Sequence, residues 1–232
     1  MQKSLRLKRL KDYVRKHKDV TITDLQSVID ASESTIRRDI KALAQEGFLH
    51  EHYGSVTLIE TKPVDILLTK RLEAELTAKQ HIGSLAATYV KSNGFIYIDA
   101  GSTTYYMIKH LQNRAVTVVT NGINIAIECN KYDLETILIG GTLKPLTMAM
   151  VGDLALDNLR HYQFDQCFMG SNGITKEGYT TPELKEGTLK KLVIQQSKEA
   201  YILADRTKEG VLASYRFASL EDAIWLHEGV MT

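Results

Sequence analysis

The chain has few of the features that mark a membrane or secreted protein. None of its apolar runs approaches the roughly 18 residues needed to cross a bilayer, so we expect no membrane-spanning segment. The amino terminus is basic without an apolar stretch behind it, which argues against a signal peptide. The 2 cysteines, Cys129 and Cys167, lie in apolar stretches without metal-ligand spacing. We therefore expect buried, reduced thiols in a cytoplasmic protein, with no metal and no cofactor.

Acidic residues are scarce at the amino-terminal end, although the net charge of the whole chain is only +1. Asp12 is the single acid among the first 18 residues, which hold 8 basic ones: Lys3, Arg6, Lys8, Arg9, Lys11, Arg15, Lys16 and Lys18. A basic end on a neutral protein indicates an anionic partner there, or else an ordinary solvated helix face. With 232 residues, the chain is long enough for one large domain or two.

The amino-terminal part has the apolar spacing of three helices followed by a hairpin. An amphipathic helix is expected from Ser4 to about Lys16. After a β-prone bridge at 20–22, Thr23 and Asp24 are expected to cap a second helix, and a third is expected over 34–46. The segment 48–58 alternates around a glycine turn and predicts a two-stranded wing. The pattern is that of a winged helix-turn-helix.

The third helix carries the residues that indicate a partner. Its apolar stripe of Ile36, Ile40 and Leu43 should face the core, so that donors on the opposite side can reach phosphates and base edges. A turn and another helix precede it, as they precede a recognition helix in the major groove. The predicted DNA-contacting residues are Ser32, Ser34, Thr35, Arg37, Arg38 and Lys41. A helical protein-interaction module is the alternative, and Asp39 is expected to pair with a neighbouring arginine.

From residue 73 onward, helical and strand-like segments alternate. Strands are expected at 95–99, 116–120, 136–139, 165–169 and 200–204, and helices at 74–91, 103–112, 123–130 and 153–160. The strands are short, apolar and β-branched, as in a sheet whose two faces are both covered by helices. We therefore predict an open, mostly parallel α/β sheet with its ligand beyond the carboxyl ends of the strands.

Small and polar residues gather at those strand ends. The stretch from Asp99 to Thr104 joins a strand to a helix through Gly101 and three hydroxyl residues, which predicts a cradle for an anion. The connection Thr180-Thr181-Pro182 should open a helix with proline at its first position. Further polar groups follow other strands or lie on that helix: Asn121, Gly141, Lys144, Asn172, Glu186, Lys190 and Lys208. Because all of them fall at one edge of one sheet, a shared binding site is favoured.

Both halves of the chain resemble one family of bacterial regulators. The stretch Ser32-Glu33-Ser34-Thr35-Ile36-Arg37-Arg38-Asp39-Ile40 resembles the recognition-helix signature of the DeoR family of transcriptional repressors. The strand-end segments of the other half resemble the same family in order, so the resemblance runs from about residue 4 to residue 226. Glu51, Tyr53, Gly54 and Ser55 stand where the family's wing has arginine, histidine and two glycines. An acid there should weaken contact with a DNA backbone.

The resemblance implies a domain plan and a ligand. It implies a DNA-binding domain at 1–58, a linker at 59–72 and an effector domain at 73–232 that is similar to sugar-phosphate isomerases. Arg71 and Lys79 resemble basic residues of the family at the start of that domain, and Lys144 is commonly arginine there. The implied effector-binding residues are Asp99, Gly101, Ser102, Thr103, Thr104, Asn121, Gly141, Lys144, Asn172, Glu186, Lys190 and Lys208, with the phosphate at 101–104 and Lys208.

Two functions from different classes stay open. The first is a non-enzymatic repressor of a carbohydrate-uptake or catabolic operon, which binds double-stranded operator DNA as a homodimer or homotetramer and responds to a phosphorylated sugar. The second is a sugar-phosphate isomerase or deaminase fused to a DNA-binding domain. For the second, Asp99 and Glu186 could serve as bases, but Asn172 lies in a turn where related isomerases carry acids. The chain ends soon after Leu226, where most relatives continue, so we expect either a missing last element or a sheet edge completed by another subunit.

Overall fold

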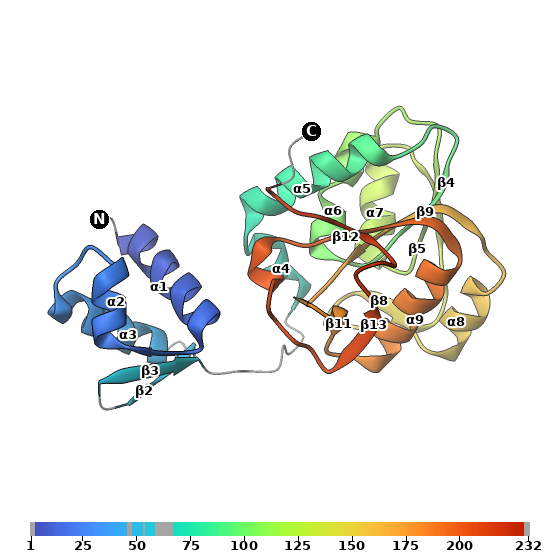
Figure 1. Ribbon diagram of the computed structural model, residues 1–232. Coiled ribbons are helices and arrows are strands. Elements are labelled where there is room, and N and C mark those ends of the chain that lie inside the picture. Colours follow the sequence, from blue (N-terminus) through green and yellow to red (C-terminus); the bar gives the residue numbers. More distant parts are fainter. Residues whose placement is uncertain (1–2, 46–47, 53, 59–66, 230–232) are drawn as a thin grey trace. The chain divides into compact units, whose positions relative to one another are not determined.

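The structure is a computed structural model that describes residues 3–45, 48–52, 54–58 and 67–229 (Figure 1). The chain divides into two compact units, Met1–Thr61 and Lys62–Thr232, and we describe each by itself. The expected linker begins outside the described residues, at 59–66. Its last part is not a linker, because α4 (Leu68–Glu73) is a helix of the second unit whose Leu68 is buried.

The amino-terminal unit packs three helices against a small antiparallel sheet. The helices are α1 (Lys3–His17), α2 (Ile22–Val28) and α3 (Glu33–Gln45), and the strands are β1 (Asp19–Thr21), β2 (Leu49–His52) and β3 (Ser55–Leu58). The sheet order is β1-β3-β2, so the bridge after α1 adds a third strand to the predicted two-stranded wing. The stripe of Ile36, Ile40 and Leu43 is fully buried. The predicted winged helix-turn-helix is confirmed.

Helix α2 begins earlier than the sequence predicted. The Thr21 hydroxyl accepts a hydrogen bond from the Asp24 N–H at 3.1 Å, and the Asp24 carboxylate accepts one from the Thr21 N–H at 2.9 Å. This reciprocal capping makes Thr21 the cap, so the prediction of Thr23 was wrong. The earlier start places Ile22 and Leu25 on one face, where both are buried in the core.

Asp39 has the arginine partner that was expected, and the partner lies on another helix. Arg6 of α1 donates hydrogen bonds from Nε and Nη2 to the two carboxylate oxygens of Asp39, the second at 3.3 Å. Asp39 is only 3% exposed. A buried carboxylate without its cation is strongly unfavourable, so this pair fixes α1 against α3.

The carboxy-terminal unit is built on a six-stranded sheet in the order β14-β12-β9-β4-β5-β6, in which every pair is parallel. The strands are β4 (Phe95–Ile98), β5 (Thr117–Thr120), β6 (Glu135–Leu138), β9 (Phe164–Gly170), β12 (Ser197–Leu203) and β14 (Ile224–Leu226). Two small antiparallel sheets accompany it: β7 (Thr142–Lys144) with β8 (Ala149–Val151), and β10 (Gly173–Thr175) with β11 (Gly178–Thr181) and β13 (Tyr215–Ala218). The predicted open, mostly parallel α/β sheet is confirmed.

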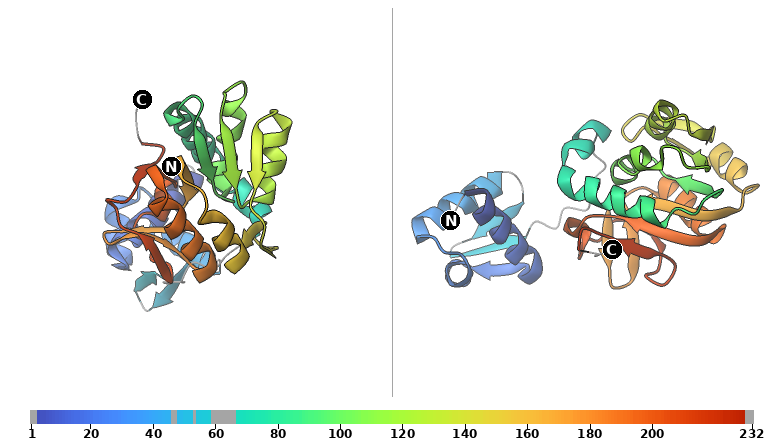
Figure 2. Two further views of the ribbon diagram at one scale, coloured as in Figure 1. Left: turned by 90° about the vertical axis from the view of Figure 1, so that its right-hand side faces the viewer. Right: turned by 90° about the horizontal axis from the view of Figure 1, so that it is seen from above.

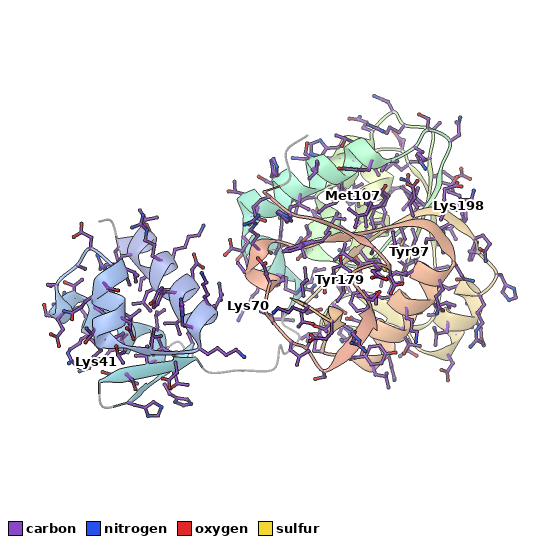
Figure 3. All side chains as sticks on the ribbon, in the orientation of Figure 1. Lys41, Lys70, Tyr97, Met107, Tyr179 and Lys198 are labelled. Carbon is purple, nitrogen blue, oxygen red and sulfur yellow. The ribbon has the colours of Figure 1, made fainter. Side chains whose placement is uncertain are left out.

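Helices cover both faces of this sheet (Figure 2). Their bounds are α5 (Leu76–Tyr89), α6 (Ser102–Tyr105), α7 (Ile123–Lys131), α8 (Asp153–Leu159) and α9 (Leu184–Gln195), with short 3₁₀ turns η1 (Ile108–Leu111) and η2 (Arg206–Lys208). Alternate residues of each strand enter two separate apolar clusters. Ile96 and Met107 belong to the cluster under α5 and α7, whereas Tyr97 and Tyr179 belong to the cluster under α8 and α9 (Figure 3).

Two predicted helices differ from the observed ones. The helix expected at 103–112 is broken into α6 and η1, and the break lies where α5 packs on the chain. A Cβ on Gly83 of α5 would lie 2.6 Å from the Tyr106 carbonyl carbon, so the two backbones are in close contact there. The helix expected to begin at Pro182 instead begins at Leu184, because the Glu183 carboxylate accepts hydrogen bonds from the Lys185 and Glu186 N–H groups and caps it. Thr181, which was expected to lie next to the start of this helix, is the last residue of β11.

Candidate functional sites

A cavity opens at the carboxyl ends of the central strands, where the sequence predicted a ligand. Its lining residues come from the strand ends, α4, α9 and the β7–β8 connection: Arg71, Tyr97, Asp99, Ala100, Gly101, Asn121, Thr147, Ala149, Gly170, Asn172, Glu186, Leu189 and Lys190. Its empty space, including the part open to solvent, is about 420 Å³.

Half of the predicted effector-binding residues line this cavity. They are Asp99, Gly101, Asn121, Asn172, Glu186 and Lys190. The remaining ones are not part of its wall: Ser102, Thr103, Thr104, Gly141, Lys144 and Lys208. Gly141 instead forms the bend between β6 and β7 at a φ of +154°, where a Cβ would lie 2.9 Å from the Val151 carbonyl oxygen. Its role there is to let two backbones approach closely.

Asp99 is the most heavily bonded side chain of the cavity. Its Oδ1 accepts hydrogen bonds from the Gly101 N–H and the Thr104 hydroxyl, each at 2.9 Å. Its Oδ2 accepts one from the Gly170 N–H at 2.9 Å and another from the ammonium group of Lys190. The four donors use the lone pairs of both oxygens, so this carboxylate organises the turn after β4 and the end of β9.

The turn after β4 needs glycine for space. Gly101 has an extended backbone, with φ −73° and ψ 152°, which any residue can adopt. A Cβ at this position would lie 2.7 Å from Asp99 Oδ1 and 2.8 Å from the Thr104 hydroxyl oxygen. The three hydroxyl residues that follow are buried, and no side chain caps α6. The helix that follows this turn, α6, is four residues long and thus shorter than the helix that the sequence predicted.

Opposite this turn the cavity wall carries hydroxyl, amide and carboxylate groups. The Tyr97 hydroxyl donates to Asn121 Oδ1 at 2.8 Å, and Asn121 Nδ2 donates to the Met150 carbonyl at 3.0 Å. The Thr147 hydroxyl donates to Glu186 Oε1 at 2.7 Å. Burial and the nearby Asp99 charge raise the pKa of Tyr97 well above its usual value, so its hydroxyl keeps its proton.

Lys144 lies outside the cavity and holds Glu186, one of its wall residues, in place. Its ammonium nitrogen lies 3.3 Å from Glu186 and 3.5 Å from Glu183, so it ties β7 to the start of α9. The Thr181 hydroxyl donates a hydrogen bond to Asn172 Oδ1 at 3.2 Å, which holds the side-chain amide of Asn172 in place. Lys144 and Asn172 are thus positioned by residues at the end of β11 and at the start of α9.

Lys79 interacts with two other cations, Arg71 and Lys208, and of the three only Arg71 lines the cavity. Lys79 of α5 is only 5% exposed and donates a hydrogen bond from its ammonium group to the Arg71 carbonyl. Burial first, and then repulsion from the nearby Lys208 charge, lower the pKa of Lys79 to about 8. Arg71 adds to this repulsion and also lines the cavity. Within the described residues its guanidinium has no hydrogen bond or ion pair.

Asp205 positions Lys208 and partly offsets the positive charge. Its Oδ1 accepts hydrogen bonds from the Thr207 N–H, at 3.0 Å, and from the Thr207 hydroxyl, so it caps η2. Asp205 is 1% exposed, and its Oδ2 has no hydrogen-bond partner in the described part of the chain. The negative charge of Asp205 favours the protonated form of Lys79.

Arg71, Tyr97 and Thr147 line the cavity but were not predicted as site residues. Arg71 and Lys79 had been singled out only as resembling basic family residues. No local pattern marks Thr147 or Tyr97, since the first lies in a connection and the second has the pattern of an apolar strand residue. Their position depends on how α4 and the β7–β8 connection fold over the sheet.

The predicted DNA-contacting residues lie just before α3 or on it, and all of them are exposed except the half-buried Thr35. Ser32 precedes the helix, and its hydroxyl lies 3.1 Å from that of Ser34 and 2.9 Å from that of Thr35. Arg37 is paired with Glu33 one turn earlier, with Nε at 2.8 Å from the carboxylate. Arg38 and Lys41 are exposed, and Lys41 is labelled in Figure 3. In the wing, Glu51 is exposed, whereas Tyr53 lies outside the described residues.

Two kinds of feature are absent from the described residues. No helix in those ranges is both long enough and apolar enough to span a membrane. No group of three or more His, Cys, Asp or Glu side chains there is arranged to hold a metal ion. Both cysteines are buried and reduced, and burial raises the pKa of Cys129 to about 11.

Fold and sites together define a winged helix-turn-helix unit and an α/β unit with a polar cavity. The family model of the DeoR-like helix-turn-helix domain matches residues 6–62, and that of the DeoR C-terminal sensor domain matches residues 74–227. The chain belongs to the DeoR family of DNA-binding transcriptional regulators, as its resemblance predicted.

Named relatives agree with this assignment. The chain is 36% identical to the uncharacterized HTH-type transcriptional regulator FruR of Bacillus subtilis, over 91% of this chain and 85% of that protein. It is 28% identical to the lactose phosphotransferase system repressor of Lactococcus lactis, over 90% of this chain and 84% of that protein. These similarities extend over both units.

Among solved structures, eIF2B delta from Chaetomium thermophilum aligns with a TM-score of 0.52 at 11% identity, covering 88% of this chain and 67% of that one. At such an identity the likeness shows the fold alone. Ribose 5-phosphate isomerase A from Methanocaldococcus jannaschii aligns with a TM-score of 0.44 at 19% identity, covering 59% of this chain and 55% of that one.

Proposed function

We propose that this protein is a repressor of a carbohydrate-uptake or catabolic operon and that a phosphorylated sugar binds in the cavity at the carboxyl edge of its sheet. One observation supports the proposal: Arg71 lines a cavity whose other groups suit sugar hydroxyls, its carbonyl accepts a hydrogen bond from the buried Lys79, and the Lys208 charge is close enough to repel Lys79. The names of relatives, among them the lactose phosphotransferase system repressor, support a carbohydrate operon.

The phosphate is best placed between the cations and the turn of residues 101–104. Lys79 lies one helical turn before Gly83 of α5, the helix that packs on the chain just after α6, and its ammonium group donates to the carbonyl of the cavity residue Arg71. Backbone N–H groups in the first turn of any helix have no partner within that helix, and α6 begins at Ser102. A phosphate there would also relieve the mutual repulsion of Lys79, Lys208 and Arg71.

The sugar would face the polar wall formed by Asn121, Thr147, Asn172 and Glu186. Amide groups can both donate to and accept from hydroxyls, whereas a carboxylate accepts from them, and such groups fix orientation in ligand sites. Arg71 is the lining side chain best able to adjust to the sugar, since in the described structure no partner holds its guanidinium.

The charge arrangement favours a monophosphate. The cations on the α9 side are already matched by carboxylates, Lys190 by Asp99 and Lys144 by Glu183 and Glu186. A second phosphate near α9 would have to break one of these buried or half-buried pairs, which leaves a carboxylate facing an anion. The cluster of Arg71, Lys79 and Lys208 carries the excess positive charge instead.

The same bonding argues for sensing over catalysis. Both oxygens of Asp99 accept hydrogen bonds, and one of them is paired with the ammonium group of Lys190, so Asp99 is held by its neighbours and is a poor candidate for removing a proton from carbon. Glu186 is held by Thr147 and Lys144. Relatives are named as transcriptional regulators, which agrees with a protein that binds its ligand and does not convert it.

The amino-terminal unit would bind double-stranded operator DNA. The residues that contact this DNA are Ser32, Ser34, Thr35, Arg37, Arg38 and Lys41. The protein would act in the cytoplasm as a homodimer or homotetramer, because helix-turn-helix proteins commonly read symmetric half-sites. Gel shifts with the DNA upstream of its own gene test this part. A shift that Arg38→Ala does not weaken at matched salt would count against the assignment of α3.

Thermal shift with a panel of pentose and hexose monophosphates, the free sugars and inorganic phosphate tests the ligand. At least one monophosphate should raise the melting temperature, because a ligand that binds only the folded state stabilises it by mass action. The parent free sugar should have no effect at the same concentration. If no monophosphate stabilises the protein, the proposed effector is wrong. Turnover of a monophosphate at an enzyme-like rate would instead establish the isomerase alternative.

A further inference from the structure

Two adjacent arginines of α3 are in different electrostatic states. Arg37 donates to Glu33 Oε1 from Nε at 2.8 Å, and its Nη2 lies at the same distance from that oxygen. The guanidinium is thus already paired with a carboxylate on its own helix. Arg38, also exposed, makes no hydrogen bond or ion pair with any other described residue. Its guanidinium is therefore free to form two parallel hydrogen bonds with a partner.

The two arginines also point in different directions. The helical period places Arg38 opposite the buried Ile36 and Ile40, in line with Ser34 and Lys41. Arg37 lies on the flank of α3, one turn above Glu33. When the outward face of a helix enters the major groove, its central residues meet base edges and its flanking residues meet the phosphate backbone.

From these contacts we infer that Arg38 reads a base pair and Arg37 grips the DNA backbone, with Glu33 restraining Arg37 until DNA is bound. The inference rests on the proposed operator binding. A base edge such as guanine O6 and N7 accepts two hydrogen bonds, so it needs an open guanidinium. Arg37 instead exchanges Glu33 for a phosphate, since an exposed ion pair within a helix is weak and easily replaced. Glu33 would repel DNA wherever Arg37 is not bound to it.

Fluorescence anisotropy with the full-length protein tests this division. The probes are the tightest-binding duplex from the DNA upstream of its own gene and a scrambled duplex of the same length, at several salt concentrations. Arg38→Ala should lower the ratio of operator to scrambled affinity about tenfold or more. Arg37→Ala should weaken both duplexes alike and make the salt dependence shallower by about one unit of slope. Lys176→Ala, an exposed change of equal charge in the other unit, is the control.

Glu33→Gln provides the converse test. It should raise the affinity for both duplexes, and the gain should shrink in the Arg37→Ala background. A collapsed ratio in Arg37→Ala together with an unchanged ratio in Arg38→Ala would overturn the division of roles. Failure of the wild-type protein to prefer any upstream duplex over the scrambled one would overturn the proposed operator binding itself, and this division with it. Circular dichroism of each variant checks that the helices are intact.

Discussion

Lys190 of α9 donates its ammonium hydrogen bond to Asp99 at the end of β4, and the two side chains are 12% and 7% exposed. Lys190 also donates to the Gly170 carbonyl at 2.9 Å, so it joins the ends of β4 and β9 to a helix that is distant in sequence. This pair holds the ends of β4 and β9 against α9. Several measurable consequences come from this arrangement and from the cations beside it.

Replacing Lys190 with alanine should destabilise the carboxy-terminal unit by about 3 kcal/mol, because the buried Asp99 carboxylate loses its cation. Urea unfolding measures the loss. Lys191→Ala is the matched control, since Lys191 is exposed on the same helix and should change stability little. Equal effects of the two substitutions would show that the pair does not support the fold.

Gly101→Ala should cost about 1–3 kcal/mol and abolish effector binding, because its Cβ would lie 2.7 Å from the Asp99 carboxylate. The cost comes from crowding, since the backbone at Gly101 is ordinary. Gly140→Ala, where no atom lies within 4 Å of the new Cβ, should be harmless. Thermal melts with and without a stabilising sugar phosphate distinguish the two variants. If the Gly101→Ala variant melts and binds like the wild type, the close packing of this turn is contradicted.

Effector affinity should fall as the pH rises from 7 to 9. The pKa of Lys79 is lowered to about 8, so its ammonium charge is lost over this range while a phosphate monoester stays dianionic. The stability of the unliganded protein changes in the opposite direction from its effector affinity. It rises above pH 8, because Lys79 makes the folded state bind fewer protons than the unfolded state there. Calorimetric titration at both pH values measures the affinity. Lys79→Met should bind weakly at pH 7 and show no such decline, and a decline that persists in this variant would exclude Lys79 as its source.

Thr21→Ala should destabilise the amino-terminal unit by about 1 kcal/mol, because it removes the oxygen that caps α2. Thr23→Ala changes the same residue type two positions later, at an exposed site inside the helix, and should be close to neutral. Denaturant unfolding of both variants gives the comparison. A larger loss for Thr23 would favour the cap first predicted from the sequence.

The sequence predicted the parts of this fold that depend on local apolar spacing. The stripe of Ile36, Ile40 and Leu43 predicted the orientation of α3, and β-branched runs such as that before Asp99 predicted the buried parallel strands. Parallel strands bring the polar residues that follow them to one edge of the sheet, and half of the predicted effector residues line the cavity there. Periodicity alone was enough for these features because each is decided within a few residues of chain.

The features that sequence reasoning missed depend on distant contacts. The helix after Thr104 breaks where Gly83 of α5 meets its backbone, a contact that no local pattern reveals. Arg71 and Thr147 reach the cavity only because α4 and the β7–β8 connection lie over the sheet, joined by a hydrogen bond from the Leu68 N–H to the Leu146 carbonyl at 3.0 Å. The start of α2 was misplaced because Thr21 and Thr23 are equally good capping residues by type, and the core position of Ile22 decides between them.

The central claim is that a sugar monophosphate in this cavity controls operator binding, and one titration tests it most directly. The affinity of the full-length protein for the DNA upstream of its own gene is measured with and without the monophosphate that stabilises it most, in wild type and in Lys79→Met. The wild-type dissociation constant should change at least about fivefold, and that of the variant should not. A wild-type dissociation constant that stays the same at saturating monophosphate would contradict the claim.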